Sequence, residues 1–507
     1  MEQGSLKAFG SVQDALIRLL SHRMLNLEYV AEYMMMPAQL NEGSSEACVY
    51  QGIRRTLPGT SVTLTPTMDP ERQTFWNWQD HLRDPGTRDT TEIAHGYAEV
   101  LRHAVRESSH GKTLAHLSGG MDSTSIAFLA ADLSRTGAIA SPVHTMTLVY
   151  ERTPDLDRER PFIEAALERA RGIVSHVVLG DDILDYDSFR DPPLLEEPYP
   201  GLWRLSMDRV SIDLAARLGM DTVLTGIGAD EIHDFLPYHL ADLIRSGHLR
   251  LAWKEASRWA RASNCSPWVL LREYGIASDM PLWAIYRTLS ALLPRGRSAL
   301  SLQDDWTIPP WIVREFAERY DLRARALANS RRRFVSPNAA VTQALRTLCY
   351  RAGDALRWTV AAPLGIHYAH PFFDSRVLSL GLGLLSRVTP EPGLMKPVLA
   401  EAMQEMLPDC IRNRRSKVGT NALYYAGLSR NLQQLGAMIR KAPAVTSEFF
   451  DCAALHQCLQ EASLAGAGVR KLQRLNYSLC LIQWLLQQEA LRRRTEPTAS
   501  FRVTVVR

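Results

Sequence analysis

The sequence predicts an α/β protein with a parallel sheet, preceded by a small α+β domain and followed by a long, mostly helical remainder. Two observations favour this class. Between Lys112 and Leu236, short apolar runs alternate with segments of helical length, and helical patterns continue from residue 237 to about 490. Strands that alternate with helices imply right-handed crossovers and a parallel sheet. The expected units are residues 1–85, residues 90–490 with a core at 112–236, and a loose basic tail at 493–507.

The first 85 residues combine helical and strand-like patterns. Apolar residues recur at helical spacing from Val12 to Leu20 and from Leu27 to Met36, whereas Ser61 to Thr65 alternates as a strand does. The segment from Arg83 to Arg88 is rich in Asp, Pro and Gly, which is typical of a linker. A helix from about Glu92 to Ser108 is expected to lead into the sheet.

The sheet is expected to contain four strands with helices between them. Ligands of a parallel sheet bind beyond the carboxyl ends of its strands, so residues that directly follow a strand are candidates for the site. Strands are expected at Leu114–Leu117, Val143–Val149, His176–Leu179 and Thr222–Thr225, and helices at Ser123–Leu133, Arg158–Ala170 and Trp203–Leu218. The clearest later helices are Leu240–Ala260, Ala339–Ala355, Met395–Met406 and Leu472–Leu491.

The composition is that of a globular protein and excludes several classes. Of 507 residues, 46% are hydrophobic and 22% are charged, and the formal net charge is only +3. This small charge does not favour a nucleic-acid binder, and no apolar stretch approaches the ~20 residues that span a membrane. Seven scattered cysteines without Cys-x-x-Cys spacing are typical of reduced thiols, so we expect a cytoplasmic protein without a disulfide frame or zinc site.

A glycine-rich turn follows the first expected strand of the sheet. Residues 118–123 read Ser-Gly-Gly-Met-Asp-Ser, and a helical pattern continues from them. Adjacent glycines let backbone N–H groups and a helix N-terminus converge on phosphate oxygens. The string differs from the Gly-x-x-x-x-Gly-Lys-Ser/Thr loop of γ-phosphate transfer, so it predicts cleavage of ATP between the α- and β-phosphates. The candidate ligands are Ser118, Gly119, Gly120, Asp122 and Ser123, with Asp122 also suited to Mg²⁺.

A second turn with two glycines follows the strand expected at residues 222–225. It reads Thr225-Gly226-Ile227-Gly228-Ala229-Asp230-Glu231. Asp230 is a hard oxygen ligand, and together with Asp122 it would bracket one or two Mg²⁺ ions over a triphosphate. Alternatively, or in addition, Asp230 caps the helix expected from Ile232. Because Ser118 and Gly226 both follow parallel strands, we expect them to share one crevice.

These two turns and two later strings resemble the synthetase domain of the asparagine synthetase family. The later strings are His370-Pro371-Phe372-Phe373-Asp374 and Leu407-Pro408, which leads to Arg414-Arg415-Ser416-Lys417, and the similarity runs from about Gly96 to Thr420. The resemblance implies a PP-loop fold of adenine nucleotide α-hydrolase type and an AMP-forming carbon–nitrogen ligase that uses ATP and Mg²⁺. By this resemblance, the 118–123 loop binds pyrophosphate, and Thr225 and Gly226 lie beside the adenosine and the α-phosphate. On the same basis, Asp122 and Asp230 bind magnesium, and Lys417 stabilises the charge that builds up during acyl transfer.

Departures from the family pattern narrow the resemblance. Position 2 is Glu2 instead of the nucleophilic cysteine of a glutaminase, and only Ile53 to Trp76 resembles the final part of that domain, so the N-terminal domain resembles a vestigial glutaminase. Ile227 and His367 stand where relatives carry their acid or base partners. These features, with a long helical insert, resemble the lasso peptide cyclases. That resemblance implies a precursor core peptide as substrate, with a leader peptidase and a leader-binding protein as partners.

The remaining catalytic candidates have competing interpretations. His367 suits a base for the attacking amine because imidazole titrates near neutral pH, but a buried, satisfied histidine fits its position as well. Glu197, with Glu196, either orients the substrate amine or forms an acidic pair at a helix entry. Without the resemblance, Lys417 would be interpreted as an ordinary surface lysine.

The favoured function is therefore an ATP-dependent macrolactam synthetase that forms an isopeptide ring in a peptide, with no nucleic-acid or membrane partner. One alternative is a small-molecule amide or β-lactam synthetase of the same family. Another alternative is a non-catalytic scaffold that keeps the fold in order to bind proteins. The presence of Asp122, Asp230 and Lys417 argues against this alternative.

Overall fold

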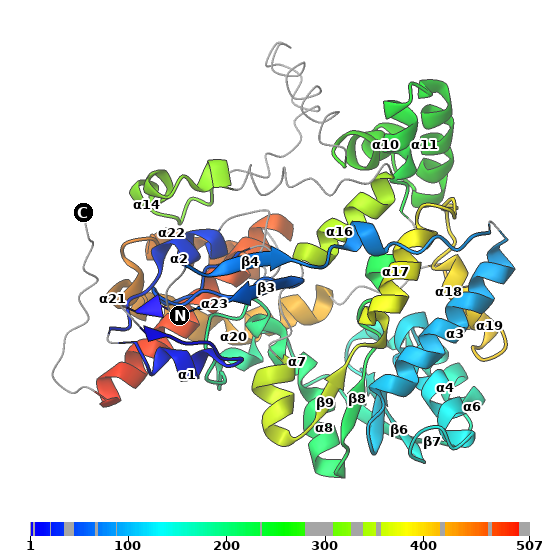
Figure 1. Ribbon diagram of the computed structural model, residues 1–507, viewed down its shortest axis with the longest axis horizontal. Helices are drawn as coiled ribbons and strands as arrows, with labels where there is room; N and C mark the ends of the chain where they lie inside the picture. The colour runs from blue at the N-terminus through cyan, green and yellow to red at the C-terminus, as the bar shows by residue number, and fades with distance from the viewer. Residues whose placement is uncertain are drawn as a thin grey trace.

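A five-stranded parallel sheet forms the centre of the α/β part in the computed structural model (Figure 1). The strand order is β7-β6-β5-β8-β9. The structure describes residues 2–3, 6–20, 22–34, 45–65, 69–87, 89–233, 236–278, 308–325, 338–350, 356–415, 421–464 and 469–495. The strands are β5 (Thr113–His116), β6 (Val143–Val149), β7 (Ile173–Leu179), β8 (Thr222–Leu224) and β9 (His367–Ala369).

The parallel sheet expected from the alternating pattern is confirmed, with one strand more than expected. All four strand pairs are parallel, and Thr113, Thr222 and His367 stand side by side in register. The additional strand, β9, lies in the part of the chain expected to be mostly helical. Its sequence, His-Tyr-Ala, is neither an apolar run like that of β8 nor long enough to show a period of two, so this strand is identified only by its pairing with β8.

Helices cover both faces of the sheet. Leu114 and Val223 belong to one hydrophobic cluster, whereas the next residues along, Ala115 and Leu224, belong to the other. This alternation follows from the period of two along a strand, and it explains why the strands read as continuous apolar runs. The first cluster includes α8 (Val210–Leu218), and the second includes α3 (Thr90–Ser108), α4 (Met121–Arg135), α6 (Arg160–Arg169) and α17 (Ser375–Leu384).

Local signals explain several helix boundaries. The Asp89 carboxylate caps α3 by accepting hydrogen bonds from the N–H groups of Thr91 and Glu92. One expected helix, Leu240–Ala260, is wrong as a single element because the chain turns at Gly247, whose φ is +79°. It forms α10 (His239–Arg245) and α11 (Leu249–Ser263). The expected Trp203–Leu218 helix is likewise divided, into a turn at Leu202–Arg204, the short α7 (Leu205–Asp208) and α8.

The N-terminal part packs into the same hydrophobic cluster as the C-terminal helices. Buried residues between Leu16 and Ile53 join a cluster that also contains Leu475 and Trp484. Its elements are β1 (Glu2–Gln3), β2 (Leu6–Lys7), α1 (Gln13–Ile17), α2 (Leu27–Met34), β3 (Thr60–Thr63) and β4 (Glu71–Thr74). The strands pair only as β1 with β2 and β3 with β4, so the described residues contain no packed pair of larger sheets of the glutaminase kind.

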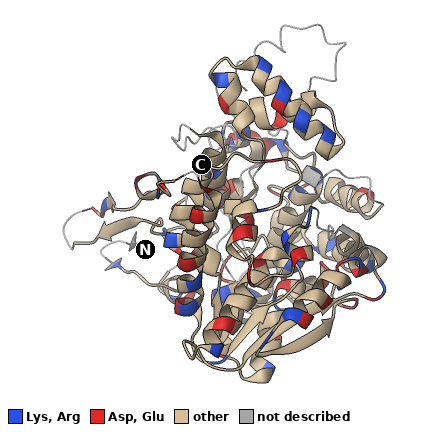
Figure 2. Cartoon of the chain, turned by 90° about the vertical axis from the view of Figure 1, so that its right-hand side faces the viewer, with Lys and Arg blue, Asp and Glu red and all other residues tan. Residues whose placement is uncertain are grey.

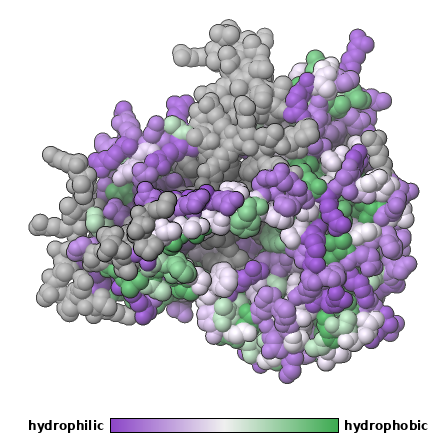
Figure 3. Space-filling model, in the orientation of Figure 1, coloured by the Kyte–Doolittle hydropathy of each residue, from purple (hydrophilic) through white to green (hydrophobic). Residues whose placement is uncertain are grey.

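The rest of the chain is mostly helical. Its elements are α5 (Pro154–Asp157), α9 (Ala229–His233), α12 (Pro267–Leu270), α14 (Arg314–Arg319), α16 (Ala339–Tyr350), α18 (Pro397–Ala402), α19 (Asp409–Arg412), α20 (Asn421–Lys441), α21 (Pro443–Thr446), α22 (Cys452–Ser463) and α23 (Val469–Thr495). Among the described residues, no helix is both long and apolar enough to cross a membrane. On the face seen in Figure 3, hydrophobic residues form only small patches between hydrophilic ones.

Candidate active site

The glycine-rich turn between β5 and α4 forms a closed loop held by serine hydroxyls. Ser118 Oγ lies 2.8 Å from Ser123 Oγ, and Ser118 N donates to Ser123 Oγ at 3.2 Å. Gly120 caps α4 with an extended backbone, and Gly119 has φ +71°, which favours glycine. A Cβ at Gly119 would lie 2.8 Å from the backbone nitrogen of Ile163, at the start of α6. The loop is therefore fixed from inside by its serines and from outside by α6.

The second glycine turn touches the first one directly. A Cβ added to Gly226 would lie 2.4 Å from the backbone nitrogen of Ser123 and 2.8 Å from the carbonyl carbon of Asp122. Since both neighbours are backbone atoms, no side-chain movement could make room. The two turns follow β5 and β8, which are adjacent parallel strands. The structure thus brings together the two motifs that the sequence predicts to share one crevice.

Three charged side chains meet where the turns join. Lys396 Nζ lies 2.7 Å from both carboxylate oxygens of Asp122, and it also contacts Asp230 Oδ1. The Lys396 side chain is only 4% exposed, whereas that of Asp230 is 70% exposed. Asp122 comes from the first turn of α4 and Asp230 from the first turn of α9. The carboxylate pair therefore converges on one cationic centre where the two glycine turns meet.

Sequence reasoning did not identify Lys396. Its only distinguishing signal is its place just before Pro397, at the start of an expected helix. Burial by itself would lower the pKa of Lys396, but the charges of Asp122 and Asp230 outweigh it and raise the pKa, so the ammonium stays protonated. The backbone of Lys396 has φ +51°, a conformation that costs a non-glycine residue about 1 kcal/mol or more. Such local strain is typical of functional sites.

Thr225 is held by a histidine from the end of β9. Its Oγ1 lies 2.6 Å from His370 Nδ1 and accepts a hydrogen bond from Ile227 N at 3.2 Å. His370 belongs to a string that the sequence singled out, although no role was predicted for it. Gly228, with φ +108°, packs against Phe372 and Phe373 of the same string. The string therefore supports the second glycine turn from behind.

Two uncharged histidines lie beneath this site. Burial, and to a lesser degree the positive charge of Lys396, lowers the pKa of His233 to about 3. Neither ring nitrogen of His233 has a hydrogen-bond partner among the described residues, and the ring packs edge-on against Tyr97 at 4.7 Å. Burial, and then His370, lowers the pKa of His116 to about 4. Both imidazoles are therefore neutral at physiological pH and add no charge to the site.

The structure does not bring His367 to the crevice. His367 begins β9 in register with Thr113, and Ser118 follows Thr113 by five residues, about 16 Å along a strand. Its N–H donates to the backbone oxygen of Asp221 at 2.8 Å, and its ring packs against His110 at 5.0 Å. Residues that begin parallel strands lie at the amino edge of a sheet, whereas this site lies at the carboxyl edge. The predicted role of His367 as base has no geometric support.

Glu197 and Glu196 contact the N-terminal part of the chain. Arg55 donates to both oxygens of Glu197, at 2.9 and 3.0 Å. Glu196 caps α1 by accepting hydrogen bonds from Gln13 N and Asp14 N, each at 3.0 Å. The acidic pair thus anchors the N-terminal segment, an interpretation that neither of the two sequence-based alternatives included.

Lys417 lies outside the described residues, but the chain just before it is fixed to α6. Arg414 forms an ion pair with Glu159 at 2.7 Å, and its guanidinium lies 4.2 Å from the ring centre of Phe162. Both charged side chains are largely buried, at 7% and 14% exposure. The same N-terminal turn of α6 supports the phosphate loop at Gly119. Helix α6 therefore connects the loop with the basic segment.

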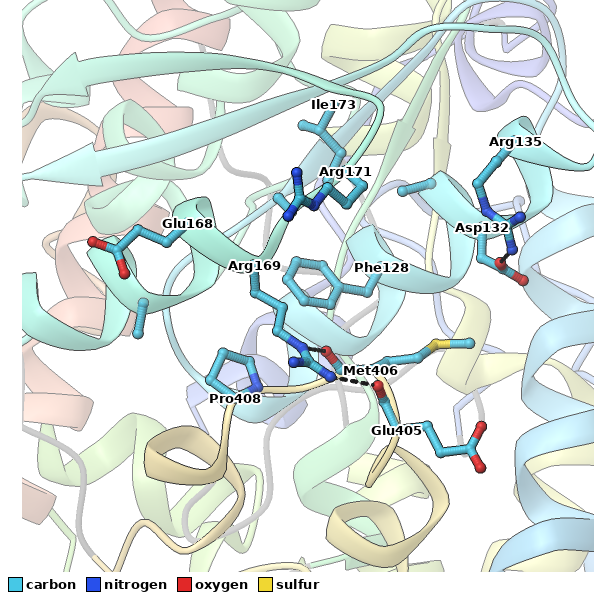
Figure 4. Close-up of a pocket in the computed structure, with 13 residues that line it drawn as sticks. Phe128, Asp132, Arg135, Glu168, Arg169, Arg171, Ile173, Glu405, Met406 and Pro408 are labelled. Atoms are coloured by element: carbon cyan, nitrogen blue, oxygen red, sulfur yellow. Dashed lines mark hydrogen bonds and ion pairs between the residues drawn. The ribbon is translucent and has the colours of Figure 1, made fainter.

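A separate cavity of about 660 Å³ lies away from these residues (Figure 4). It is lined by side chains of α4 and α6, including Phe128 and Arg135, and by the segment before α19. Arg169 crosses it and donates to the backbone oxygens of Glu405 at 2.8 Å and Met406 at 3.1 Å. None of the predicted site residues lines this cavity.

The donor set at the crevice fits a magnesium ion that arrives with a triphosphate. Asp122 and Asp230 both reach one cationic atom, Lys396 Nζ, so their oxygens are close enough to hold a cation together. Mg²⁺ prefers oxygen ligands and usually binds through one or two carboxylates plus phosphates and water. Among the described residues, no group of three or more His, Cys, Asp or Glu side chains would hold a metal alone.

Together, a parallel sheet covered on both faces and a glycine-rich loop with two carboxylates at its carboxyl edge define a nucleotide-binding α/β protein. The chain belongs to the asparagine synthase family, whose family model matches residues 96–487. Membership implies an ATP-dependent ligase that forms amide bonds, and members bind ATP, typically with Mg²⁺.

A curated relative shares only part of this chain. It is "Amidase chyE" of Penicillium rubens, 28% identical over 200 residues. The match covers 36% of this chain and 28% of that protein. Because the chain spans less than a third of the relative's length, the likeness extends to the shared part alone.

Proposed function

We propose that the protein is an ATP-dependent macrolactam synthetase of the lasso peptide cyclase type. It adenylates the side-chain carboxylate of an Asp or Glu within a leader-cleaved precursor peptide. The peptide's own N-terminal amine then attacks the activated carbonyl and closes an isopeptide ring. A leader peptidase and a leader-binding protein supply the substrate.

The observation that carries the nucleotide half of this proposal is the contact between the two glycine turns. Gly226 touches the backbone of Ser123, and Asp122 and Asp230 share Lys396. Backbone N–H groups of the loop and the start of α4 favour an anion there, and the buried charge of Lys396 adds to this preference. A bound magnesium ion held by Asp122 and Asp230 would neutralise charge on the phosphate oxygens.

A peptide substrate is supported by the connection between β8 and β9. A parallel crossover needs only a dozen or more residues, but here it runs from Leu224 to His367 and includes α10, α11, α12, α14 and α16. Ordering a flexible peptide costs about 1–2 kcal/mol per residue in backbone entropy. The extra helical surface in this connection would provide contacts that offset this cost.

The chemistry proceeds in two balanced steps. A carboxylate oxygen of the peptide attacks the α-phosphorus of ATP, and pyrophosphate leaves from an in-line position beside the Ser118–Ser123 loop. The N-terminal amine attacks the resulting acyl adenylate, an amide bond forms, and AMP and one proton leave. Lys417 stabilises the negative charge that develops in this second step.

The test uses the full-length protein, Mg·ATP and synthetic core peptides with a free N-terminal amine and one internal Asp or Glu. We expect a product lighter by one water, with AMP and pyrophosphate in equal amounts. Acetylation of the amine should abolish cyclisation while pyrophosphate release continues. Formation of ADP, or activity that ignores the internal carboxylate, would exclude the proposed reaction.

A small-molecule amide or β-lactam synthetase is the alternative within the family. It would use ATP on a free amino-acid-like carboxylate and release pyrophosphate without any peptide. A non-catalytic scaffold would release no pyrophosphate from ATP, whichever carboxylate is added. The Asp122→Ala substitution would leave the biological role of such a scaffold intact. The same pyrophosphate assay, run with a panel of free amino acids beside the peptides, separates all three.

A further inference from the structure

Helices α10, α11 and α12 form a small module with a core of its own. Residues on these helices and the turn after them pack on one another, separately from the two clusters that enclose the sheet. In Figure 1 the module stands at the upper right, apart from the sheet. It contributes no residue to the candidate active site. Its buried members are Leu240, Ala252, Ala256, Trp259, Ala260, Leu270 and Leu271.

Two exposed tryptophans meet on the surface of this module. Trp253 on α11 is 43% exposed and Trp268 on α12 is 67% exposed. Their ring centroids are 5.2 Å apart with planes at 64°, an edge-to-face contact. Leu249, four residues before Trp253, is also exposed and lies on the same side of α11. Tryptophan is one of the residues enriched at the energetic centres of protein interfaces.

The module carries more basic than acidic side chains, and its acids are already paired. Between residues 236 and 278 every acidic residue has an arginine partner: Asp242 pairs with Arg245, Glu255 with Arg258 and Glu273 with Arg272. The other basic residues are Arg250, Lys254 and Arg261, and none has a carboxylate partner within the described part of the chain. Figure 2 shows Lys and Arg outnumbering Asp and Glu on the helices at the top.

The unpaired cations form one stripe beside the tryptophans. Residues 254 and 261 follow residue 250 by four and eleven positions, so at 100° per residue the three side chains project within about 40° of one another. Trp253 directly precedes Lys254 and borders this stripe. We call Leu249, Arg250, Trp253, Lys254, Arg261 and Trp268 the Trp–basic surface.

We propose that the Trp–basic surface binds an acidic polypeptide segment whose apolar side chains cover Trp253 and Trp268. The unpaired positive stripe selects negative charge, and the paired rings supply the apolar area of the contact. A membrane surface fits less well, because an interfacial helix buries its whole apolar face in lipid. The apolar side of α11 is already used against α10 and α12. The proposal does not depend on the cyclisation reaction.

Fluorescence anisotropy with the full-length protein tests this proposal. The probe is a fluorescein-labelled peptide rich in Glu with spaced Leu and Phe, and its counterpart has Lys in place of Glu. We expect the acidic peptide to bind, more weakly at about 300 mM than at about 50 mM salt, and the basic peptide not to bind. Arg250→Glu with Lys254→Glu, and Trp253→Ala with Trp268→Ala, should each weaken binding at least about tenfold, a loss of ~1.4 kcal/mol.

Matched controls come from the same chain. Trp358 is 73% exposed in the 357–361 turn, and Arg314 lies on α14, so Trp358→Ala and Arg314→Glu should leave binding unchanged. Circular dichroism verifies that every variant is folded. The proposal is overturned if the acidic peptide does not bind, or if its binding survives both double substitutions. The proposal is also overturned, in favour of a membrane-binding surface, if the protein binds no peptide but sediments with phosphatidylserine vesicles only when Trp253 and Trp268 are present.

Discussion

At the scale of single residues, Lys396 is the side chain on which the two halves of the site depend. Lys396→Met removes a positive charge that Asp122 and Asp230 share and leaves two carboxylates close together. We expect ATP–pyrophosphate exchange to fall by about 10²-fold or more. We also expect MgCl₂ to raise the melting temperature of this variant more than that of the wild type, because the metal then supplies the positive charge that Lys396 supplied to the carboxylate pair. An equal magnesium response in both proteins would contradict this account.

Gly226 is a second residue whose identity the geometry requires. Gly226→Ala places a Cβ against the backbone of Ser123, so the two turns must separate. We expect a loss of stability of about 1–3 kcal/mol and a larger loss of ATP affinity. The control is Gly96→Ala on α3, where a Cβ meets nothing within 4 Å. This change should stabilise the protein by about 0.5–1 kcal/mol. Urea unfolding and nucleotide titration measure both effects.

At the scale of secondary structure, α6 acts as a support between the phosphate loop and the segment that ends at Arg414. Glu159→Gln removes the charge of Glu159 from its ion pair with the buried guanidinium of Arg414, and breaking such a pair costs about 3–5 kcal/mol. Asp157→Asn removes the exposed ion pair with Arg160 near the same helix, a change worth less than about 1 kcal/mol. We therefore expect Glu159→Gln to lower both the melting temperature and the rate of ATP–pyrophosphate exchange more than Asp157→Asn does. Equal behaviour would show that α6 does not support the loop.

The elements also show where sequence patterns succeed and where they stop. β5, β6, β8 and α3 follow directly from apolar runs, a capping aspartate and helical spacing. The sequence patterns did not predict the three-residue strand β9 or the division of residues 240–260 into two helices. Strand β9 has no apolar run like that of β8 and is too short to show a period of two. The helical pattern continues across Gly247, whose φ of +79° ends the first helix.

At the scale of the whole molecule, the contact of Arg55 with Glu197 fixes the N-terminal part to the α/β part. If Glu197 only anchors this contact, Glu197→Arg should lower the melting temperature and the activity together. Adding Arg55→Glu to the same chain reverses the ion pair and should restore both at least partly. If Glu197 acts on the substrate, the double variant should regain stability without regaining turnover. Melting temperature and kcat of the four proteins distinguish these outcomes.

The buried neutral histidines make the stability of the molecule depend on pH. Burial, then Lys396, lowers the pKa of His233 in the folded state to about 3, whereas an unfolded histidine titrates near 6.5. Between these values the unfolded chain binds more protons, so His233 favours unfolding increasingly as pH falls below 6.5, by up to ~1.4 kcal/mol per pH unit. In urea titrations, His233→Phe should therefore lose less stability than the wild type between about pH 7 and pH 5. A parallel loss in both proteins would refute this assignment.

Local patterns along the chain were sufficient to predict the family, the parallel sheet and the two glycine turns. Each of these depends on residues that are close in sequence, such as glycines that follow an apolar strand and precede a helix, and parallel topology places such turns at one edge of a sheet. The contacts that other parts of the chain make with Asp122, Asp230, Thr225 and Glu197 emerged only from the folded chain. Lys396 reaches Asp122 and Asp230 from the residue just before α18, His370 reaches Thr225 from the residue just after β9, and Glu197 is turned towards Arg55. Such contacts join residues far apart in sequence, and the spacing along the chain carries no information about them.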